Sequence, residues 1–145
     1  MASKTDFMEN KCIDSLWRGQ AYTPTTAYFA LFTAASTETG TGTEVTGGSY
    51  ARVAVTCSLA NFAGTQGAGT TTASTGTSGT TSNNVAITFP APTANWGVVT
   101  HWAVFDAASG GNMTYYGALT ASKTINNGDS APSFPAGSFT MQEDN

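Results

Sequence analysis

The chain has 145 residues, with five Lys and Arg against nine Asp and Glu, which gives a formal net charge of −4. Nucleic acids and anionic membranes bind clustered cations, so this composition argues against both partners. Leu, Ile, Val and Phe make only 22 residues, whereas Thr, Gly and Ser make 26, 16 and 13. We expect one β-rich domain, residues 1–145, with a thin core whose stability depends on partners or on oligomerisation.

An N-terminal amphipathic helix is predicted at about 5–18. Its apolar residues recur at the spacing of one helical face: Phe7, Met8, Cys12, Ile13, Leu16 and Trp17. Asp6 and Glu9 resemble a capping box, and Gly19 is placed to end the helix. The helix packs on its own domain, which is favoured, or docks as an arm on a neighbouring subunit. In the second case Phe7, Met8 and Trp17 are candidate contacts.

Short strands are predicted after the helix, in chain order at 27–32, 50–58, 85–89, 98–105 and 113–119, with a last strand or strand pair containing Phe134, Phe139 and Met141. The segments 27–32 and 98–105 are apolar on both faces and read as central strands. In 98–105, alternation places Val99 on the face opposite Trp102. The turn at 108–112 predicts a hairpin between 98–105 and 113–119.

These strands predict a mainly β fold, an antiparallel β-sandwich of which the jelly roll is one form. The central strands need cover on their second face, from the helix or from another subunit. We therefore expect a homo-oligomer. The chain has no apolar run long enough to span a membrane, and its N-terminus lacks the pattern of a signal peptide.

The segment 63–84 is rich in Thr, Gly and Ser and contains no charge. A stretch of this length without structure is uncommon inside a compact domain. A flexible surface loop is favoured. The alternative is an extended arm that pairs with a partner, for which Thr70, Thr71 and Thr72 are candidate contacts.

Residues with catalytic chemistry are few. His101 and Asp106 lie near one end of the predicted strand 98–105, but G-x-S-x-G is absent and the spacing matches no known triad. The hypothesis that the protein is a hydrolase of cell-wall polymer depends on these two residues alone. A structural role for His101 is favoured. Cys12 and Cys57 form no metal or redox motif and are expected to be reduced. We predict no catalytic, metal or cofactor site.

Aromatic residues give a further candidate surface. Trp96, Trp102, Tyr115 and Tyr116 lie close in sequence around one predicted hairpin. Exposed rings there would bind sugar, whereas buried rings would fill the core or a subunit interface. The core or interface role is favoured, and Trp96, Tyr115 and Tyr116 are candidate partner contacts.

Several blocks of the sequence resemble a family of small virion proteins of tailed bacteriophages. They are, in order, KTDFMENKCIDSLWRG, YFALFTAA, GTEVTGGSYARVAVT, ITFPAPTANWGVVTHWAVFDAASGGNMTYYGAL, KTINNGD and FPAGSFTM. The similarity covers nearly the whole chain outside the segment 63–84. It implies a structural component of the virion, made in the host cytoplasm, and carries over no active site.

Two roles follow from the resemblance. The preferred role is a capsid cement or decoration protein that binds the major capsid protein at junctions between capsomers, in association with copies of itself, with a trimer suspected. Members of the family are often labelled tail-fibre proteins. The alternative role is therefore a tail or tail-fibre component that attaches to host surface glycans.

Overall fold

The structure, a computed structural model, describes residues 2–143. No helix in that part of the chain is long and apolar enough to cross a membrane. The elements are, in chain order, β1 (Ala2–Lys4), α1 (Asp6–Trp17), β2 (Thr26–Ala34), β3 (Thr43–Glu44), β4 (Val53–Thr56), β5 (Thr80–Ser82), β6 (Ile87–Thr88), β7 (Gly97–Phe105), β8 (Met113–Ile125), β9 (Ser133–Phe134) and β10 (Thr140–Gln142).

The main sheet has six strands in the order β1-β8-β7-β2-β3, and β4 also pairs with β2. All of these pairings are antiparallel. The predicted hairpin is confirmed as β7 and β8, and the two segments predicted to be central are β2 and β7. Strands covered on both faces read as continuous apolar runs, which is why these two were identifiable.

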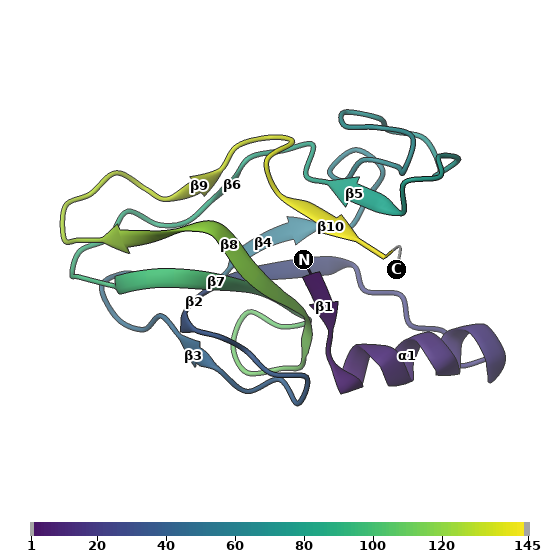
Figure 1. The fold of residues 1–145 in the computed structure, drawn as a ribbon, viewed down its shortest axis with the longest axis horizontal. Coiled ribbons are helices and arrows are strands. Elements are labelled where there is room, and N and C mark those ends of the chain that lie inside the picture. The colour runs from purple at the N-terminus through teal and green to yellow at the C-terminus, as the bar shows by residue number, and fades with distance from the viewer. Residues whose placement is uncertain (1, 144–145) are drawn as a thin grey trace.

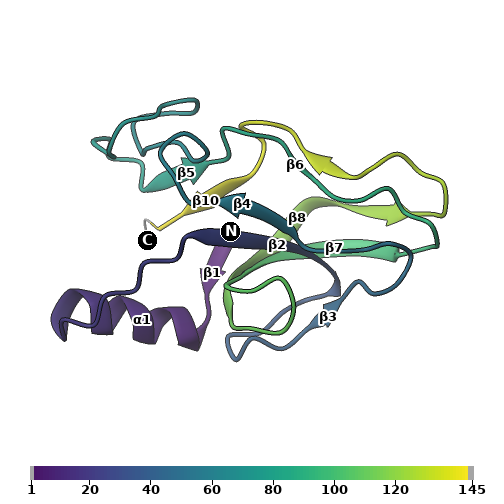
Figure 2. The ribbon, with the colours of Figure 1, turned by 180° about the vertical axis from the view of Figure 1, so that it is seen from behind.

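The second layer consists of two short antiparallel ladders, β10 with β5 and β6 with β9. They lie along the same side of the main sheet in both views (Figures 1 and 2). The larger core lies between the layers and joins β2 and β7 side chains with side chains from the ladders, among them Leu31, Trp102, Ile87 and Phe139. The mainly β fold with antiparallel sheets and one N-terminal helix is thus confirmed in a sandwich-like arrangement. The jelly-roll form is not confirmed.

The alternation predicted for β7 is wrong at one end. Val99 packs in the larger core with Trp102, on the face predicted to be opposite to it, and Val98 is 47% exposed. The pairing with β8 shifts between Val99 and His101. A bulge of this kind reverses the alternation of the residues beyond the bulge. No pattern in the sequence of β7 predicts such a bulge.

The second face of the main sheet is covered by the chain itself. Its buried side chains form a smaller core: Ala30, Phe32, Ala103, Phe105 and Met113. The loop after β2 lies against this face, since a Cβ on Gly42 would be 2.8 Å from the Phe32 ring. The Arg52 guanidinium stacks 3.4 Å from the centre of the Phe105 ring. Loops of the same chain, and not the helix, therefore cover the buried part of this face, and the contact with another subunit stays a prediction.

Arg52 is held over the sheet by a partly buried polar network. Its side chain is 7% exposed and forms two 2.8 Å hydrogen bonds to the Glu44 carboxylate. It also donates to the carbonyl oxygens of Ala107 and Gly110. The Tyr50 hydroxyl donates to Glu44 and accepts from the backbone N–H of Leu31. These bonds tie β3, the loop before β4 and the turn after β7 to β2 at the centre of the main sheet.

The segment 63–84 folds back on itself as a compact loop in the single chain, and its pairing with a partner stays a prediction. The Thr70 hydroxyl donates to the Gly67 carbonyl and accepts from the Gly64 N–H. The Ser78 hydroxyl donates to the Thr65 carbonyl oxygen across the loop. Near its end the loop supplies β5, which pairs with β10 and so belongs to the second layer.

Candidate functional site

The helix α1 is anchored at its N-terminal end. Thr5, only 1% exposed, accepts from the Met8 N–H as the N-cap and donates through its hydroxyl to the Met113 carbonyl at 2.5 Å. The cap is thus one residue earlier than the predicted capping box at Asp6. Phe7 packs edge-on against Tyr22, with 5.9 Å between ring centres. The first turns of the helix therefore belong to the body of the protein.

The C-terminal half of α1 projects beyond the end of the sheet (Figures 1 and 2). No helix residue is fully buried, and Ile13, Leu16 and Trp17 are 53%, 75% and 80% exposed. We call these three side chains the helix face. The helix ends at Trp17 with Arg18 as its C-cap, and Gly19 follows with a φ of +68°, a conformation that glycine adopts without strain. The helix is therefore neither fully packed on its own domain nor fully free to dock on a neighbour, since its first half packs on the domain and its second half projects from it.

A partner that covers the helix face would stabilise the assembly by burying apolar side chains. Burial of one large aliphatic side chain contributes about 1.5–3 kcal/mol, so covering three partly exposed ones contributes about 5 kcal/mol per subunit. Association costs about 4–15 kcal/mol in lost translational and rotational freedom. The helix face alone is therefore a contact that must act together with others. Ile13 and Leu16 were not among the candidate contacts, although their spacing placed them on the face of Trp17.

The aromatic candidates do not form one patch. Trp96 is 5% exposed, donates from its indole to the Gly48 carbonyl at 3.0 Å and packs against Tyr50. Tyr115 and Tyr116 point to opposite faces of β8, the first toward the larger core and the second toward the smaller one. Burial raises the pKa of the Tyr115 phenol, and its hydrogen bond to Glu143 raises it further. Trp96 thus serves the core of this subunit.

The three threonine candidates differ in what they do. Thr70 closes the loop through the hydrogen bonds described above. The Thr72 hydroxyl accepts from the Gln66 amide at 2.9 Å. Thr71 is exposed at the surface of the same loop. Two of the three therefore hold the loop in shape, and Thr71 is the one that faces outward.

His101 and Asp106 do not face each other as a proton-transfer pair. The His101 ring is bonded through Nδ1 to the neighbouring Thr100 hydroxyl at 2.7 Å. The Asp106 carboxylate accepts from the backbone and side-chain nitrogens of Asn112, which closes the turn between β7 and β8. Five positions along an extended strand separate the two residues by about 16 Å. Asp106 therefore has a structural role in the hairpin.

The two cysteines are unpaired and half-buried. Cys57 lines a small apolar pocket of about 160 Å³ with Met8 and Tyr22, where the helix meets the sheet. Burial raises the pKa of the Cys57 thiol. Among residues 2–143 no group of three or more His, Cys, Asp or Glu side chains is placed to hold a metal ion.

Comparison with known proteins gives one match. A family model described as Podophage GP4 fiber I protein gp80 matches residues 3–142. No curated protein matches the chain. The matched region includes every strand from β2 to β10 and the whole of α1. The chain therefore belongs to this family of phage virion structural proteins.

Proposed function

We propose that this chain is a tail or tail-fibre component that takes part in attachment of the phage to the host surface, acting by binding and without catalysis. The observation that carries the proposal is the family match over residues 3–142, because the family description names a fiber. That description names no capsid component. The fibre role is therefore preferred to the capsid cement role and to the major capsid protein as a partner.

Other copies of this chain are the partners that the helix face suits best. The helix face is apolar and lies beyond the body of the subunit, so two or more copies can bring it together without displacing the sheet. The one charged pair beside it, Asp14 with Arg18, is exposed and internally neutralised at 3.0 Å. It therefore adds little repulsion between copies.

Adsorption of the phage to its host tests the attachment role. Purified chain, added to cells of the strain on which the phage plates, is expected to slow adsorption because it occupies the same surface groups. Bovine serum albumin at equal concentration is the control. Equal adsorption rates with the chain and with albumin, at concentrations at which the chain is shown to be folded, would contradict the proposal.

The helix face is tested by a Leu16→Ser/Trp17→Ser variant in sedimentation velocity. We expect the parent to sediment as an oligomer and the variant to sediment as a folded monomer, with the circular dichroism spectrum almost unchanged because both side chains are exposed in the isolated subunit. Leu59→Ser, at a 55% exposed leucine outside the helix, is the matched control. A parent that stays monomeric, or a variant that stays assembled, would refute this contact.

A further inference from the structure

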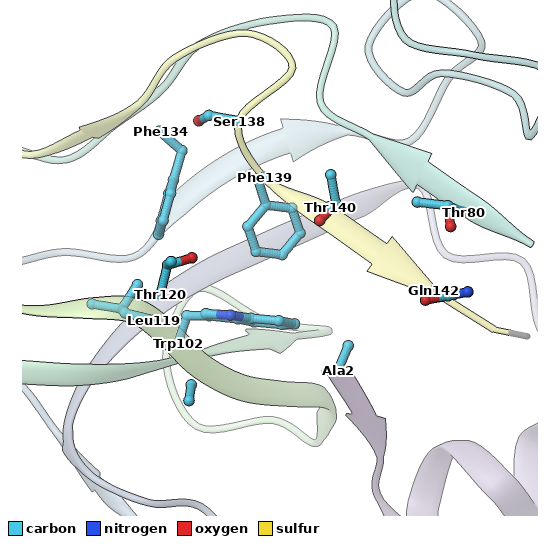
Figure 3. Close-up of a pocket in the computed structure, with 11 residues that line it drawn as sticks. Ala2, Thr80, Trp102, Leu119, Thr120, Phe134, Ser138, Phe139, Thr140 and Gln142 are labelled. Carbon is cyan, nitrogen blue, oxygen red and sulfur yellow. The ribbon is translucent and has the colours of Figure 1, made fainter. Parts of the chain in front are cut away.

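A groove lies between β8, in the main sheet, and the second layer (Figure 3). Its volume is about 410 Å³, within the range of about 300–1,000 Å³ that small-molecule sites occupy. The apolar part of its lining comes from Trp102, Leu119, Phe134 and Phe139. Trp102 and Phe139 are packed edge to face, 4.6 Å between ring centres, which fixes both rings.

The rim of the groove carries neutral hydrogen-bonding groups. Thr120, Thr140 and Gln142 line it, are exposed and make no side-chain hydrogen bond within residues 2–143. Two further hydroxyls, of Thr80 and Ser138, also line it and bond to nearby carbonyl oxygens. The free hydroxyls and amide offer both donors and acceptors to a ligand.

The Trp102 side chain also lines this groove. The residue is 6% exposed, and within the described residues its indole N–H makes no hydrogen bond, although it is not one of the fully buried polar atoms without a partner. The contrast is Trp96, whose indole N–H donates to Gly48. An indole N–H that solvent reaches in the wall of a groove can donate to a ligand as well as to water.

A distortion of β8 shapes the groove. Between the pairs His101 with Ala118 and Val99 with Lys123, β7 advances two residues while β8 advances five. The extra residues of β8 include Leu119 and Thr120, which line the groove. Bulges re-aim side chains and interrupt the ladder, so this stretch of edge is unsuited to pairing with a peptide strand.

Among residues 2–143 the lining contains no ionisable side chain. A phosphate, carboxylate or sulfate would therefore enter without a cation to pair with, at a desolvation cost that nothing in the groove offsets. A ligand with several hydroxyls and an apolar face matches both the rim and the aromatic wall. A sugar ring has these two properties, since its hydroxyls lie at the edge and its C–H groups cover a face.

We propose that this groove binds a neutral saccharide, with Thr120, Thr140 and Gln142 bonding to ring hydroxyls and the Trp102 indole N–H donating to a sugar oxygen. The inference rests on the proposed function, because it names the host-surface group that the fibre component would recognise. It also replaces the predicted aromatic patch, of which only Trp102 lies in the groove.

The test is binding of the full chain to an array of neutral and acidic glycans, followed by titration of a retained glycan. We expect retention of neutral glycans, and at least about tenfold weaker binding by a Thr120→Val/Thr140→Val variant, which removes two hydroxyls at nearly constant shape. Thr124→Val, on an exposed position of the same strand outside the groove, is the control and should bind as the parent does. In nuclear magnetic resonance spectra the glycan should shift the Trp102 indole N–H signal and leave that of Trp96 in place.

Three results would overturn the proposal: no neutral glycan retained, acidic glycans retained in preference, or equal binding by the double variant. Its failure is separable from failure of the fibre role. Binding of a neutral glycan is a property of the isolated chain and persists wherever the protein lies in the particle. Conversely, a fibre protein with no glycan binding would refute the groove alone.

Discussion

Replacement of Arg52 by alanine should strongly destabilise the subunit. The substitution removes the ion pair with Glu44, two hydrogen bonds to backbone carbonyls and the stacking on Phe105. Breaking a buried ion pair by removing one partner costs about 3–5 kcal/mol. Since Glu44 is 24% exposed and regains some water, we expect a loss of about 3 kcal/mol in the free energy of unfolding.

The assay is urea unfolding together with thermal unfolding. For a domain of this size, a loss of about 3 kcal/mol lowers the melting temperature by about 6–12 °C. Arg18→Ala is the matched control, because Arg18 also pairs with an acidic residue but is 70% exposed, and its loss should cost at most about 0.5 kcal/mol. Arg52→Lys keeps the charge but not the two parallel bonds and should fall between the two. If Arg52→Ala and Arg18→Ala unfold alike, the second face of the sheet is not closed in the way described.

Three further perturbations follow from the packing. Ser36→Ala should raise the free energy of unfolding by about 1 kcal/mol, because the buried hydroxyl of Ser36 has no partner within residues 2–143, and a lower stability in urea would contradict this. Gly76→Ala should speed proteolysis within 63–84, since a Cβ there would lie 2.2 Å from the Thr65 carbonyl oxygen; a cleavage rate equal to the parent's would show that the loop is not held as described. Burial raises the pKa of Tyr50 and Tyr115 above the usual 10.0, so both phenols keep their protons in the folded state when the unfolded chain has lost them. Stability should thus be constant below about pH 10 and fall above it by up to about 1.4 kcal/mol per pH unit for each tyrosine, measured by urea unfolding from pH 8 to 12, and a flat profile would refute the burial of these phenols.

The long strands and the helix could be predicted from the sequence because their patterns extend over many residues. Apolar residues on both faces of 27–32 and 98–105 identified the central pair, and the glycine-rich turn identified the hairpin that follows. By contrast β1, β3 and β5 have only two or three residues each. No periodicity is visible over such a length, and their pairing is decided by the tertiary fold.

The site was predicted less well, because exposure depends on partners in space. The helical spacing of Ile13, Leu16 and Trp17 is the same for a packed helix and a projecting one. Trp96 was a candidate contact by its aromatic chemistry, yet Gly48 and Tyr50 enclose it. The groove draws on β7, β8 and the second layer together, and the bulge that turns Thr120 into it has no signature in the sequence.

The position of the protein in the particle is the measurement that tests the central claim most directly. Antibody raised against the purified chain, coupled to gold and applied to intact phage, should label the tail fibres in electron micrographs. Pre-immune antibody is the control for adventitious binding. Uniform labelling of the head, with the tail unlabelled, would contradict the fibre role and restore the capsid cement role.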